Sequence, residues 1–447
     1  MKFIRINMKN QTISTEIVAG EFAGSGGRGL TSMLIQVEIP ADCDPLGQDN
    51  KLILAPGLLS GTALVNTGRL SIGAKSPLTG GIKESNVGGT IADNLARMGI
   101  AAIIIEEMPQ NDGQFILQLD ANGVPELFET DEYRGMHTYA LVENLLDTYG
   151  KESGILCIGP AGELHMNIAS IQASDVDGRP CRAAGRGGMG AVMGSKGIKA
   201  IIVDSSKKAS APVADTKAFK DAAKRFAKAV REAPFSGKAL PAFGTAALMG
   251  PVNSLGAFPC YNATKGVFEN WEKIGGEALA ETIQQRGGKT KHMGCSECII
   301  LCSNEYVDTV GKYVTACLEY ESLWAAGGMC GIDDLESFAR IEYLCDNIGV
   351  DSISTGVAIA ILMDAGQMRF GDGEAVIRTL AEIPAYDPDN GIEIDLPGSP
   401  TVQDLLAYLK ISESEGGVAI TDGRILGVGN KLPEGKRISV FPVAEGG

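Results

Sequence analysis

Three cysteines lie within eight residues in the stretch CSECIILC, at Cys295, Cys298 and Cys302. Thiolates bind Zn²⁺ or the irons of iron–sulfur clusters, and short spacing lets one loop present several of them to a single centre. The stretch therefore predicts a metal site. His292, three residues before Cys295, would complete a Cys₃His zinc site, so both zinc and an iron–sulfur cluster are kept as interpretations.

A glycine-rich stretch, CRAAGRGGMGAVMGSKGIKAIIVD, contains G-x-G-x-x-G at Gly185, Gly187 and Gly190. A dinucleotide-binding loop of this type follows a buried strand, whereas DGRPCR precedes the glycines here. We therefore expect a loop whose N–H groups, together with Arg182 and Arg186, bind a phosphate or another anion. A tight turn packed on a sheet would explain some of the glycines but not the two arginines.

A second stretch, TGRLSIGAKSPLTGGIKESNVGGT, combines Arg69 and Asn86 with the small residues Gly88 and Gly89. Cationic and amide donors beside glycines permit close approach of a polar ligand. The alternative is an ordinary glycine-rich hairpin.

Carboxylates form the remaining candidates. In CDNIGVD, Asp346 falls in the last turn of an expected helix, where the helix dipole disfavours a negative charge, and Asp351 precedes the next helix. The pair would accept hydrogen bonds from a ligand, although Asp351 also fits a helix N-cap. In LEYESLW, Glu319 and Glu321 lie among apolar residues, where burial would raise a carboxyl pKa and suit an acid or base. A solvated face is the alternative.

The elements that must position these residues fall into three parts, and the predicted class is α+β. Residues 1–207 contain short apolar runs such as KFIRINM, LILAPG, AAIIIEE, FILQLD, GILCIGPAGE and KAIIVD, which are typical of strands, with a helix near 91–98. Residues 208–388 show helical spacing, starting at Thr216 as an N-cap and again over 333–349. We expect a β-rich first domain and a mostly helical middle domain.

The last part, residues 389–447, predicts a small domain of its own. GIEIDLP is read as a strand, TVQDLLAYLKI as a helix opened by a capping box of Thr401 and Asp404, and GVAITDG, RILG and RISVFPVAEGG as further strands. The chain closes with Gly446 and Gly447.

Composition limits the partners. The 447 residues are 44% hydrophobic and 21% charged, with a net charge of −16 and no basic run, which argues against nucleic acid or an anionic membrane surface. No stretch approaches the roughly 18 apolar residues of a membrane span. We expect a cytoplasmic protein, in which ten cysteines indicate metal or redox chemistry rather than disulfides.

The stretches SPLTG…NVGG, RAAGRGGMGAVMGSKGIKAI, CSECIILC, EYESLW and CDNIGVDSISTG together resemble the tungsten-containing aldehyde ferredoxin oxidoreductase family, over about residues 5–387. The resemblance implies a bis-pterin cofactor holding tungsten, or molybdenum, and a nearby 4Fe–4S cluster, with Mg²⁺ as a further candidate ion. It implies oxidation of a small aldehyde to a carboxylic acid, with electrons passed to ferredoxin or another electron-transfer protein.

The resemblance also assigns residues. It places pterin-binding positions in the N-terminal and middle parts of the chain, at Arg69, Asn86, Gly88, Arg182, Ala183, Gly185, Asp346, Val350 and Asp351. Cys295, Cys298 and Cys302 match three cluster ligands, and Glu321 matches a carboxylate near the metal that would activate water.

Two departures from the family accompany these matches. The family's third helical domain, which supplies the fourth cluster cysteine and further pterin contacts, is not expected in this chain, so Cys317 or Cys330 is considered as a substitute. Arg340 and Tyr343 stand where some members carry an E-x-x-H metal bridge between subunits, so that bridge is not expected. A homodimer or a partner chain is kept as a source of missing ligands.

The segment from about Gly391 to Gly447 resembles β-grasp sulfur carriers such as the small subunit of molybdopterin synthase. The resemblance implies that Gly447 is adenylated by a partner enzyme and converted to a thiocarboxylate. An alternative function follows: a catalytically degenerate protein that binds pterin cofactor or carries sulfur for its synthesis.

Overall fold

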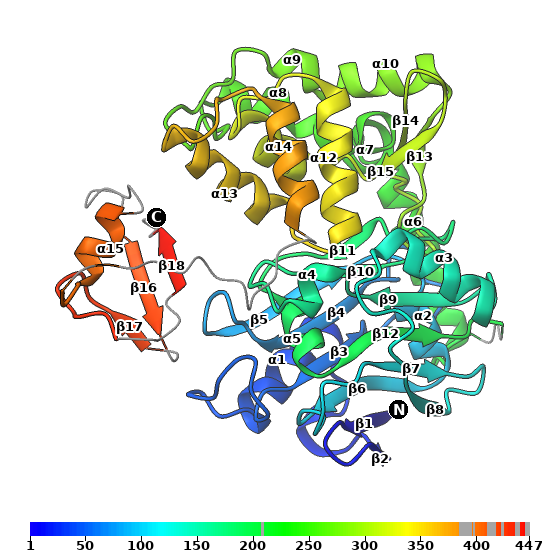
Figure 1. Cartoon of the computed structure of the whole chain (residues 1–447). Coiled ribbons are helices and arrows are strands. Elements are labelled where there is room, and N and C mark those ends of the chain that lie inside the picture. Colours follow the sequence, from blue (N-terminus) through cyan, green and yellow to red (C-terminus); the bar gives the residue numbers. More distant parts are fainter. Residues whose placement is uncertain are drawn as a thin grey trace. The chain divides into compact units, whose positions relative to one another are not determined.

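The structure, a computed structural model, describes residues 1–206, 210–383, 396, 398–408, 417–421, 424–433 and 439–442. The chain divides into two compact units, Met1–Pro384 and Ala385–Gly447 (Figure 1). The predicted boundary at residue 207 lies inside the first unit and stays a prediction.

The first unit begins with a six-stranded sheet of order β2-β1-β6-β3-β4-β5, in which only β1 and β6 are parallel. Its strands are β1 (Lys2–Asn7), β2 (Thr12–Ile17), β3 (Leu52–Pro56), β4 (Leu70–Lys75), β5 (Ile82–Val87) and β6 (Ile100–Glu106). Helix α1 (Gly27–Glu38) packs on one face, and η1 (Gly20–Phe22) and α2 (Ile91–Arg97) lie in the connections. The strands expected in KFIRINM, LILAPG and AAIIIEE are confirmed.

A second six-stranded sheet has the order β11-β10-β9-β12-β7-β8. Its strands are β7 (Phe115–Leu119), β8 (Pro125–Glu129), β9 (Gly154–Cys157), β10 (Ile171–Ala173), β11 (Arg182–Ala184) and β12 (Ile198–Val203), with helices α3 (Thr138–Tyr149), α4 (Pro160–Glu163) and α5 (Met189–Ser195). The strand before the glycine loop, β11, is an edge strand antiparallel to β10. A parallel βαβ unit is therefore not formed, as the residues before the glycines predicted.

Alternation of side chains explains how the two sheets stack. In β6, Ile103 and Ile105 belong to the core shared by both sheets, whereas Ile104 faces α1. In β9, Leu156 enters the shared core while Ile155 faces α3. Because successive strand residues point to opposite faces, strands buried on both sides read as continuous apolar runs. The result is four layers in the order α1, first sheet, second sheet, α3.

The rest of the first unit is mainly helical, as expected, and has its own core. Its helices are α6 (Thr216–Glu232), η2 (Phe235–Ala239), α7 (Leu240–Phe243), η3 (Gly244–Leu248), α8 (Met249–Ser254), α9 (Trp271–Ile274), α10 (Gly276–Arg286), α11 (Tyr320–Ser322), η4 (Leu323–Gly328), α12 (Leu335–Ile348), α13 (Ser352–Asp364) and α14 (Gly373–Glu382). Helices α12 and α14 lie side by side (Figure 1). A small antiparallel sheet of order β13-β14-β15 comprises β13 (Lys289–His292), β14 (Ser303–Val307) and β15 (Tyr313–Ala316).

Helix ends follow the expected capping chemistry with one correction. Asp215, not Thr216, caps α6, because its carboxylate accepts the N–H of Ala218 at 2.9 Å. Gly349 ends α12 with φ of +82°, a conformation that favours glycine.

The second unit is described in part. Helix α15 (Val402–Tyr408) starts with the predicted capping box: Thr401 N–H donates to Asp404 at 2.7 Å, and the Asp404 N–H donates to Thr401 Oγ1 at 3.3 Å. Strands β16 (Gly417–Thr421), β17 (Arg424–Leu426) and β18 (Ser439–Pro442) form an antiparallel sheet of order β17-β16-β18. Most of the strand expected in GIEIDLP, and Gly446 and Gly447, lie outside the described residues.

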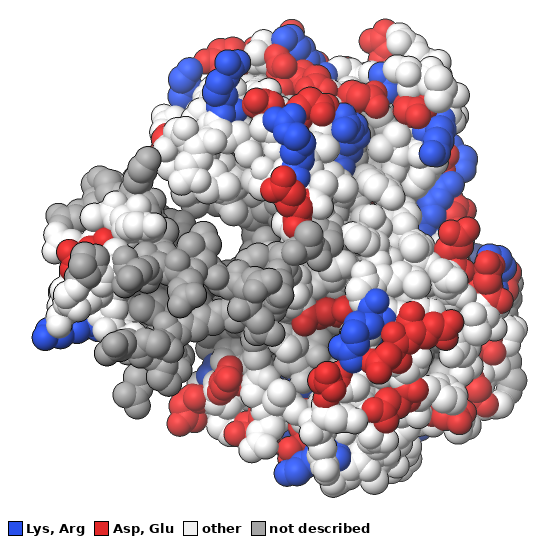
Figure 2. All heavy atoms as spheres, viewed as in Figure 1, with Lys and Arg blue, Asp and Glu red and all other residues white. Residues whose placement is uncertain are grey.

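Two further features are the charges on the surface and the state of the cysteines. Figure 2 shows acidic and basic side chains interspersed over the face it draws. All ten cysteines are free thiols. Among the helices that the structure describes, none is long and apolar enough to cross a membrane.

Candidate functional site

The three cysteines lie on the loop between β13 and β14, and this loop docks on the first sheet. The Gly89 N–H donates to Gly294 O, and the Ser296 N–H donates to Gly89 O, both at 3.0 Å. Asn66 Oδ1 accepts the N–H of Ile299 at 2.9 Å. The two backbone hydrogen bonds to Gly89 fix the loop against the glycine-rich stretch that follows β5, and the bond to Asn66 adds a third point of attachment.

The cysteine loop holds two non-glycine residues in the left-handed region, Glu297 at φ +54° and Leu301 at φ +57°. Such conformations cost energy and persist where the surroundings impose them, often at functional sites. They turn the loop so that Cys295, Cys298 and Cys302 are each half-buried. Burial raises the pKa of the Cys302 thiol to about 12, and Glu319 adds to the rise, so a bound cation is needed to deprotonate it at neutral pH.

Arg69 and Gly88 meet Cys295 directly. Arg69 Nη1 lies 3.5 Å from Cys295 Sγ, and the same guanidinium donates to the side-chain oxygen of Asn86 and, at 3.0 Å, to its backbone oxygen. A Cβ on Gly88 would stand 2.8 Å from Cys295 Sγ, so only glycine fits this approach. The structure thus brings the Arg69–Gly88 stretch and the cysteine loop together, although they are more than 200 residues apart.

Arg182 lies on the other side of the loop and is 8% exposed. Its guanidinium donates to Ser303 Oγ and lies 3.5 Å from the Glu319 carboxylate. It also packs on Gly294, where a Cβ would stand 2.1 Å from Arg182 Cζ. Its Nε is buried and has no hydrogen-bond partner among the described residues. A buried cation with a free donor beside three thiols suits an anionic ligand.

Glu319 and Glu321 lie around the start of α11. Burial raises the pKa of the Glu319 carboxyl, Arg182 opposes this rise, and the charge of Glu321 adds to it. A buried carboxyl with a raised pKa beside a cation is a candidate acid or base. Sequence reasoning favoured Glu321, whereas the ion pair with Arg182 belongs to Glu319.

The helix corner that carries Val350 and Asp351 docks on the second sheet. Val350 forms a β-bridge with Ala169, and the Asp351 N–H donates to Ile168 O at 3.0 Å. A Cβ on Gly185 would lie 2.8 Å from Asp351 Oδ1, so the glycine loop and the carboxylate are in close contact. Two predicted pterin-binding residues, Gly185 from the sheet part of the first unit and Asp351 from its helical part, therefore lie in contact.

Asp351 is also the N-cap of α13, accepting the Ser354 N–H at 2.8 Å. The structural explanation that the sequence left open therefore holds for Asp351. Asp346 is buried and its Oδ2 has no hydrogen-bond partner. Ala183, another predicted contact, is an exposed residue of β11.

One buried acid was missed. Glu342, one helical turn before Asp346 on α12, is 7% exposed; its Oε1 accepts from Ser322 at 3.2 Å and its Oε2 has no partner. Burial raises the pKa of Glu342 to about 8, and Glu319 adds to the rise. Burial likewise raises the pKa of Asp346 well above its usual range. The four-residue spacing of the two acids was visible in the sequence, because it puts Glu342 on the same helix face.

The zinc interpretation does not fit. His292 Nε2 contacts Asp177 at 2.8 Å and Nδ1 contacts Ser303 at 3.2 Å, so the imidazole is turned away from the thiols. A tetrahedral zinc site needs sulfur atoms about 3.8 Å apart. Over the described part of the chain, the one group of three or more ligand atoms within 4.8 Å of one another is Asp175, Asp177 and His292, and the three thiols form no such group.

The two candidates for the fourth cluster ligand, Cys317 and Cys330, lie in different surroundings. Cys330 is 1% exposed and its thiol donates to Ala325 O and Gly356 O inside the helical core. Cys317 is buried beside the site, with its sulfur 3.7 Å from Ser303 Oγ, and has a left-handed backbone at φ +68°. Of the two, Cys317 is the one near the loop.

The donor set fits an anionic, sulfur-ligated centre. Three half-buried thiols are flanked by two arginines, and buried polar atoms without partners point to a ligand: Arg182 Nε, Asp346 Oδ2 and Glu342 Oε2. Glycines at the closest approaches, Gly88 and Gly185, leave backbone and side-chain donors within reach of such a ligand.

Fold and site together define a class of protein: two stacked sheets and a helical part that hold a thiol-bearing loop against an arginine- and glycine-lined cradle. Residues 3–205 match the family model of the aldehyde ferredoxin oxidoreductase N-terminal domain, and residues 221–387 match that of aldehyde ferredoxin oxidoreductase domains 2 and 3. Over these two ranges the chain belongs to the aldehyde ferredoxin oxidoreductase family.

Individual relatives support the same family assignment. The chain is 36% identical over 366 residues to the tungsten-containing aldehyde ferredoxin oxidoreductase of Pyrococcus furiosus, covering 81% of this chain and 58% of that protein. The protein of the same name from Thermococcus kodakarensis is 34% identical over 407 residues, 87% of this chain and 64% of its own length. The chain thus spans about three-fifths of these relatives.

A solved structure supports the fold alone. The active site complex BamBC of benzoyl coenzyme A reductase, in complex with 1,5-dienoyl-CoA, matches with a TM-score of 0.72 at 20% identity, over 86% of this chain and 60% of that chain.

Proposed function

We propose that this chain oxidises small aldehydes to carboxylic acids with a tungsten, or molybdenum, bis-pterin cofactor and a 4Fe–4S cluster, and passes the electrons to ferredoxin or another electron-transfer protein. The observation that carries the proposal is the docking of the cysteine loop between Arg69–Gly88 and Arg182, because it places thiols and cations around one site. Family membership and the names of the relatives support it.

Different residues of this chain would hold the cluster, the cofactor charges and the pterin. Cys295, Cys298 and Cys302 would hold the cluster, while Arg69 and Arg182 would neutralise its charge and that of the cofactor. The pterin side would be held by Asn86, Gly88, Ala183, Gly185, Asp346, Val350 and Asp351, with Mg²⁺ as a further candidate ion. When bound, the metal–pterin centre accepts two electrons and the cluster passes them on one at a time.

The overall reaction, aldehyde plus water to carboxylic acid, two protons and two electrons, requires a base. Glu321 would take a proton from the attacking water, as the family resemblance implies. Glu319, with its raised pKa and its contact to Arg182, would hold a proton beside the same site. Glu319→Gln and Glu321→Gln, compared by kcat at unchanged metal content, separate the two roles.

Metal analysis of anaerobically purified protein tests the proposal. Tungsten or molybdenum with about four iron atoms per chain, together with aldehyde-dependent reduction of a viologen dye, is the expected result. Iron without either heavy metal would contradict the oxidoreductase and leave a cluster-binding protein. Zinc alone would contradict both centres.

The second unit favours a second candidate function. The family models stop at residue 387, and the described part beyond it forms a capped helix and a three-stranded antiparallel sheet. We propose that this unit is a β-grasp sulfur carrier whose Gly446–Gly447 end is adenylated by a partner enzyme and converted to a thiocarboxylate. ATP would supply the AMP of the acyl-adenylate, and sulfide would displace that AMP to leave the thiocarboxylate. Mass spectrometry after incubation with such an enzyme, ATP and sulfide would show the oxygen-to-sulfur mass change on Gly447, and an unmodified terminus would contradict the proposal.

Assembly and location complete the proposal. Arg340 pairs with Glu374 at 2.5 Å, and the Tyr343 ring packs at a tilt of 37° against Tyr139 with ring centres 4.8 Å apart, so the positions of the family's E-x-x-H bridge are engaged within this chain. A homodimer, if formed, would use other residues, or a partner chain would supply the fourth cluster ligand. A cytoplasmic location suits a cluster that is labile to oxygen.

A further inference from the structure

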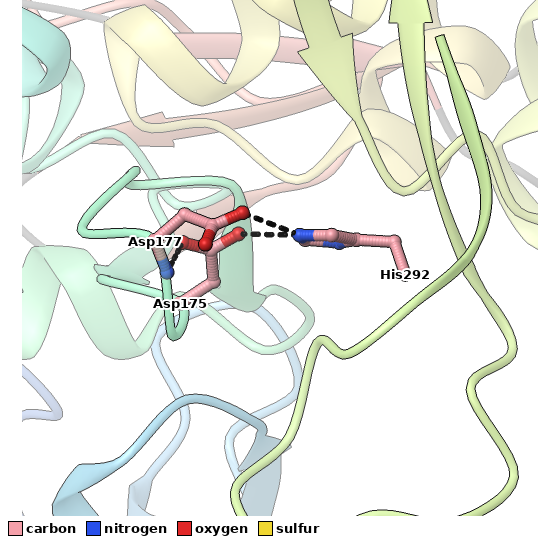
Figure 3. A group of neighbouring side chains, drawn as sticks. All are labelled: Asp175, Asp177 and His292. Carbon is pink, nitrogen blue, oxygen red and sulfur yellow. Dashed lines mark hydrogen bonds and ion pairs between the residues drawn. The ribbon is translucent and has the colours of Figure 1, made fainter.

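A line of polar contacts leads from the surface to Arg182. Asp177 Oδ2 faces His292 Nε2 (Figure 3). The two atoms are 2.8 Å apart, and His292 Nδ1 lies 3.2 Å from Ser303 Oγ. Ser303 Oγ in turn is bonded to Arg182 Nη2. The Asp177 side chain is 40% exposed, whereas His292 and Ser303 are 6% and 3% exposed. The contacts therefore join solvent to the cysteine site through buried groups.

The chemistry of the donors sets the direction of these bonds. Arginine only donates, so Ser303 Oγ accepts from Arg182. The hydroxyl hydrogen then goes to His292 Nδ1, which at 3.2 Å is closer than its other acceptors, Asn304 O at 3.5 Å and Cys317 Sγ at 3.7 Å. The neutral imidazole then carries its proton on Nε2 and donates it to Asp177. The hydrogen bond from His292 lowers the pKa of Asp177, consistent with a carboxylate at this end. Every bond points from the arginine towards the carboxylate.

We propose that Asp177, His292 and Ser303 form a positioning relay that holds the Arg182 guanidinium against the cysteine loop. The segment after His292 also restrains the Arg182 guanidinium, because Gly294 packs directly on it. That the held arginine serves a cofactor rests on the proposed function, whereas the relay itself does not.

A cation site would use the same residues in a different way. Asp175 Oδ2 lies 3.9 Å from His292 Nε2, and a divalent ion between Asp175, Asp177 and His292 would need Nε2 without a proton. The proton would then be on Nδ1 and donate to Ser303. Asp175 is already satisfied, since its Oδ1 accepts the N–H of Asp177 at 2.9 Å and its Oδ2 accepts from the Cys181 thiol at 3.3 Å. The tautomer of His292 separates the two arrangements.

The chain has only three histidines, so imidazole ¹⁵N NMR of histidine-labelled protein, purified with a chelator and free of cofactor, reads this tautomer directly. The relay requires a neutral Nε2–H form for His292, and Asp177→Asn should shift the ¹⁵N signals of this residue and leave those of His165 unchanged. An Nδ1–H form, or saturable displacement of the His292 signals by one equivalent of Zn²⁺, would overturn the relay in favour of a metal site.

The amount of iron that the protein retains tests whether His292 positions Arg182. His292→Ala should lower the affinity of the loop for iron by about tenfold after anaerobic reconstitution, the size of effect expected when a supporting hydrogen-bond partner is lost. His292→Asn should restore most of it, because the amide oxygen replaces Nδ1 as acceptor from Ser303. His165→Asn is the matched control at an exposed position.

Two results contradict the relay here: wild-type iron retention in His292→Ala, or no difference between the alanine and asparagine variants. Should the alanine variant not fold, the asparagine variant and the NMR tautomer decide. The NMR readout needs no bound metal, whereas iron retention presupposes the cluster of the proposed function, so the relay and the proposed function can fail separately.

Discussion

The Arg182 guanidinium lies directly against the backbone of Gly294, at a distance that leaves no room for a methyl group: a Cβ on Gly294 would stand 2.1 Å from Arg182 Cζ. This contact joins the glycine-loop side of the site to the cysteine loop. Since Arg182 is buried, it cannot move aside without giving up its bonds to Ser303 and Glu319.

Gly294→Ala should therefore displace Arg182. We expect a loss of iron retention and a destabilisation of about 1–3 kcal/mol, the usual cost of overpacking. Iron analysis after reconstitution and chemical unfolding measure the two effects. Gly81→Ala is the control, because a Cβ there meets nothing within 4 Å. Equal iron content in both variants would show that Arg182 is not held by this contact.

Glu342 should make the fold less stable as pH rises. Its pKa is about 8 in the folded chain against an ordinary value of 4.5. Between these pH values the unfolded chain has lost the proton while the folded chain keeps it, so the free energy of unfolding falls with pH, by up to about 1.4 kcal/mol per unit. Below pH 4.5 no penalty exists, and above about 8 it is complete.

Glu342→Gln stays neutral and keeps an acceptor for Ser322, so its stability advantage over the wild type should grow from pH 5 to pH 8. Urea unfolding at several pH values measures the difference. Glu143→Gln, at an exposed position of α3, should show no such growth. Parallel curves for wild type and Glu342→Gln would mean that Glu342 is ionised in the folded chain.

Asp351 combines a helix cap with a proposed pterin contact, and two substitutions separate these roles. Asp351→Ala should cost about 1 kcal/mol through loss of the cap, whereas Asp351→Asn keeps a capping oxygen and should cost little. Both should lower the amount of pterin released from purified protein, measured by fluorescence after oxidation. Asp372→Ala removes the cap of α14 and is the matched control, with pterin content unchanged. Full pterin content in Asp351→Asn would restrict this residue to capping.

Substitution of a cysteine in the loop should lower the amount of bound iron, whereas substitution of a core cysteine should not. Cys298→Ser should lose most of the bound iron, because the thiolate is a proposed ligand. Cys330→Ala should keep it, since its thiol is bonded to Ala325 O and Gly356 O within the helical core, and should lose only about 1 kcal/mol of stability. Loss of iron in Cys330→Ala without unfolding would contradict the placement of this cysteine.

The local parts of the fold could be predicted because their signals are local. Continuous apolar runs identified the strands, since strands buried on both faces need apolar side chains throughout. The capping box of Thr401 and Asp404 identified α15, because its two hydrogen bonds span three residues. Short spacing likewise pointed to Cys295, Cys298 and Cys302 as a metal site.

Where a partner comes from a distant part of the chain, the sequence alone determined less. It allowed His292 as a zinc ligand, but tertiary contacts turn its ring to Asp177 and Ser303. It gave Asp351 two roles, and the cap is the one that the structure shows. The sequence by itself determined the residue types of the site and the elements that carry them. Only the tertiary structure decided which of them meet, because packing of the sheets against the helical part sets those contacts and local propensity does not.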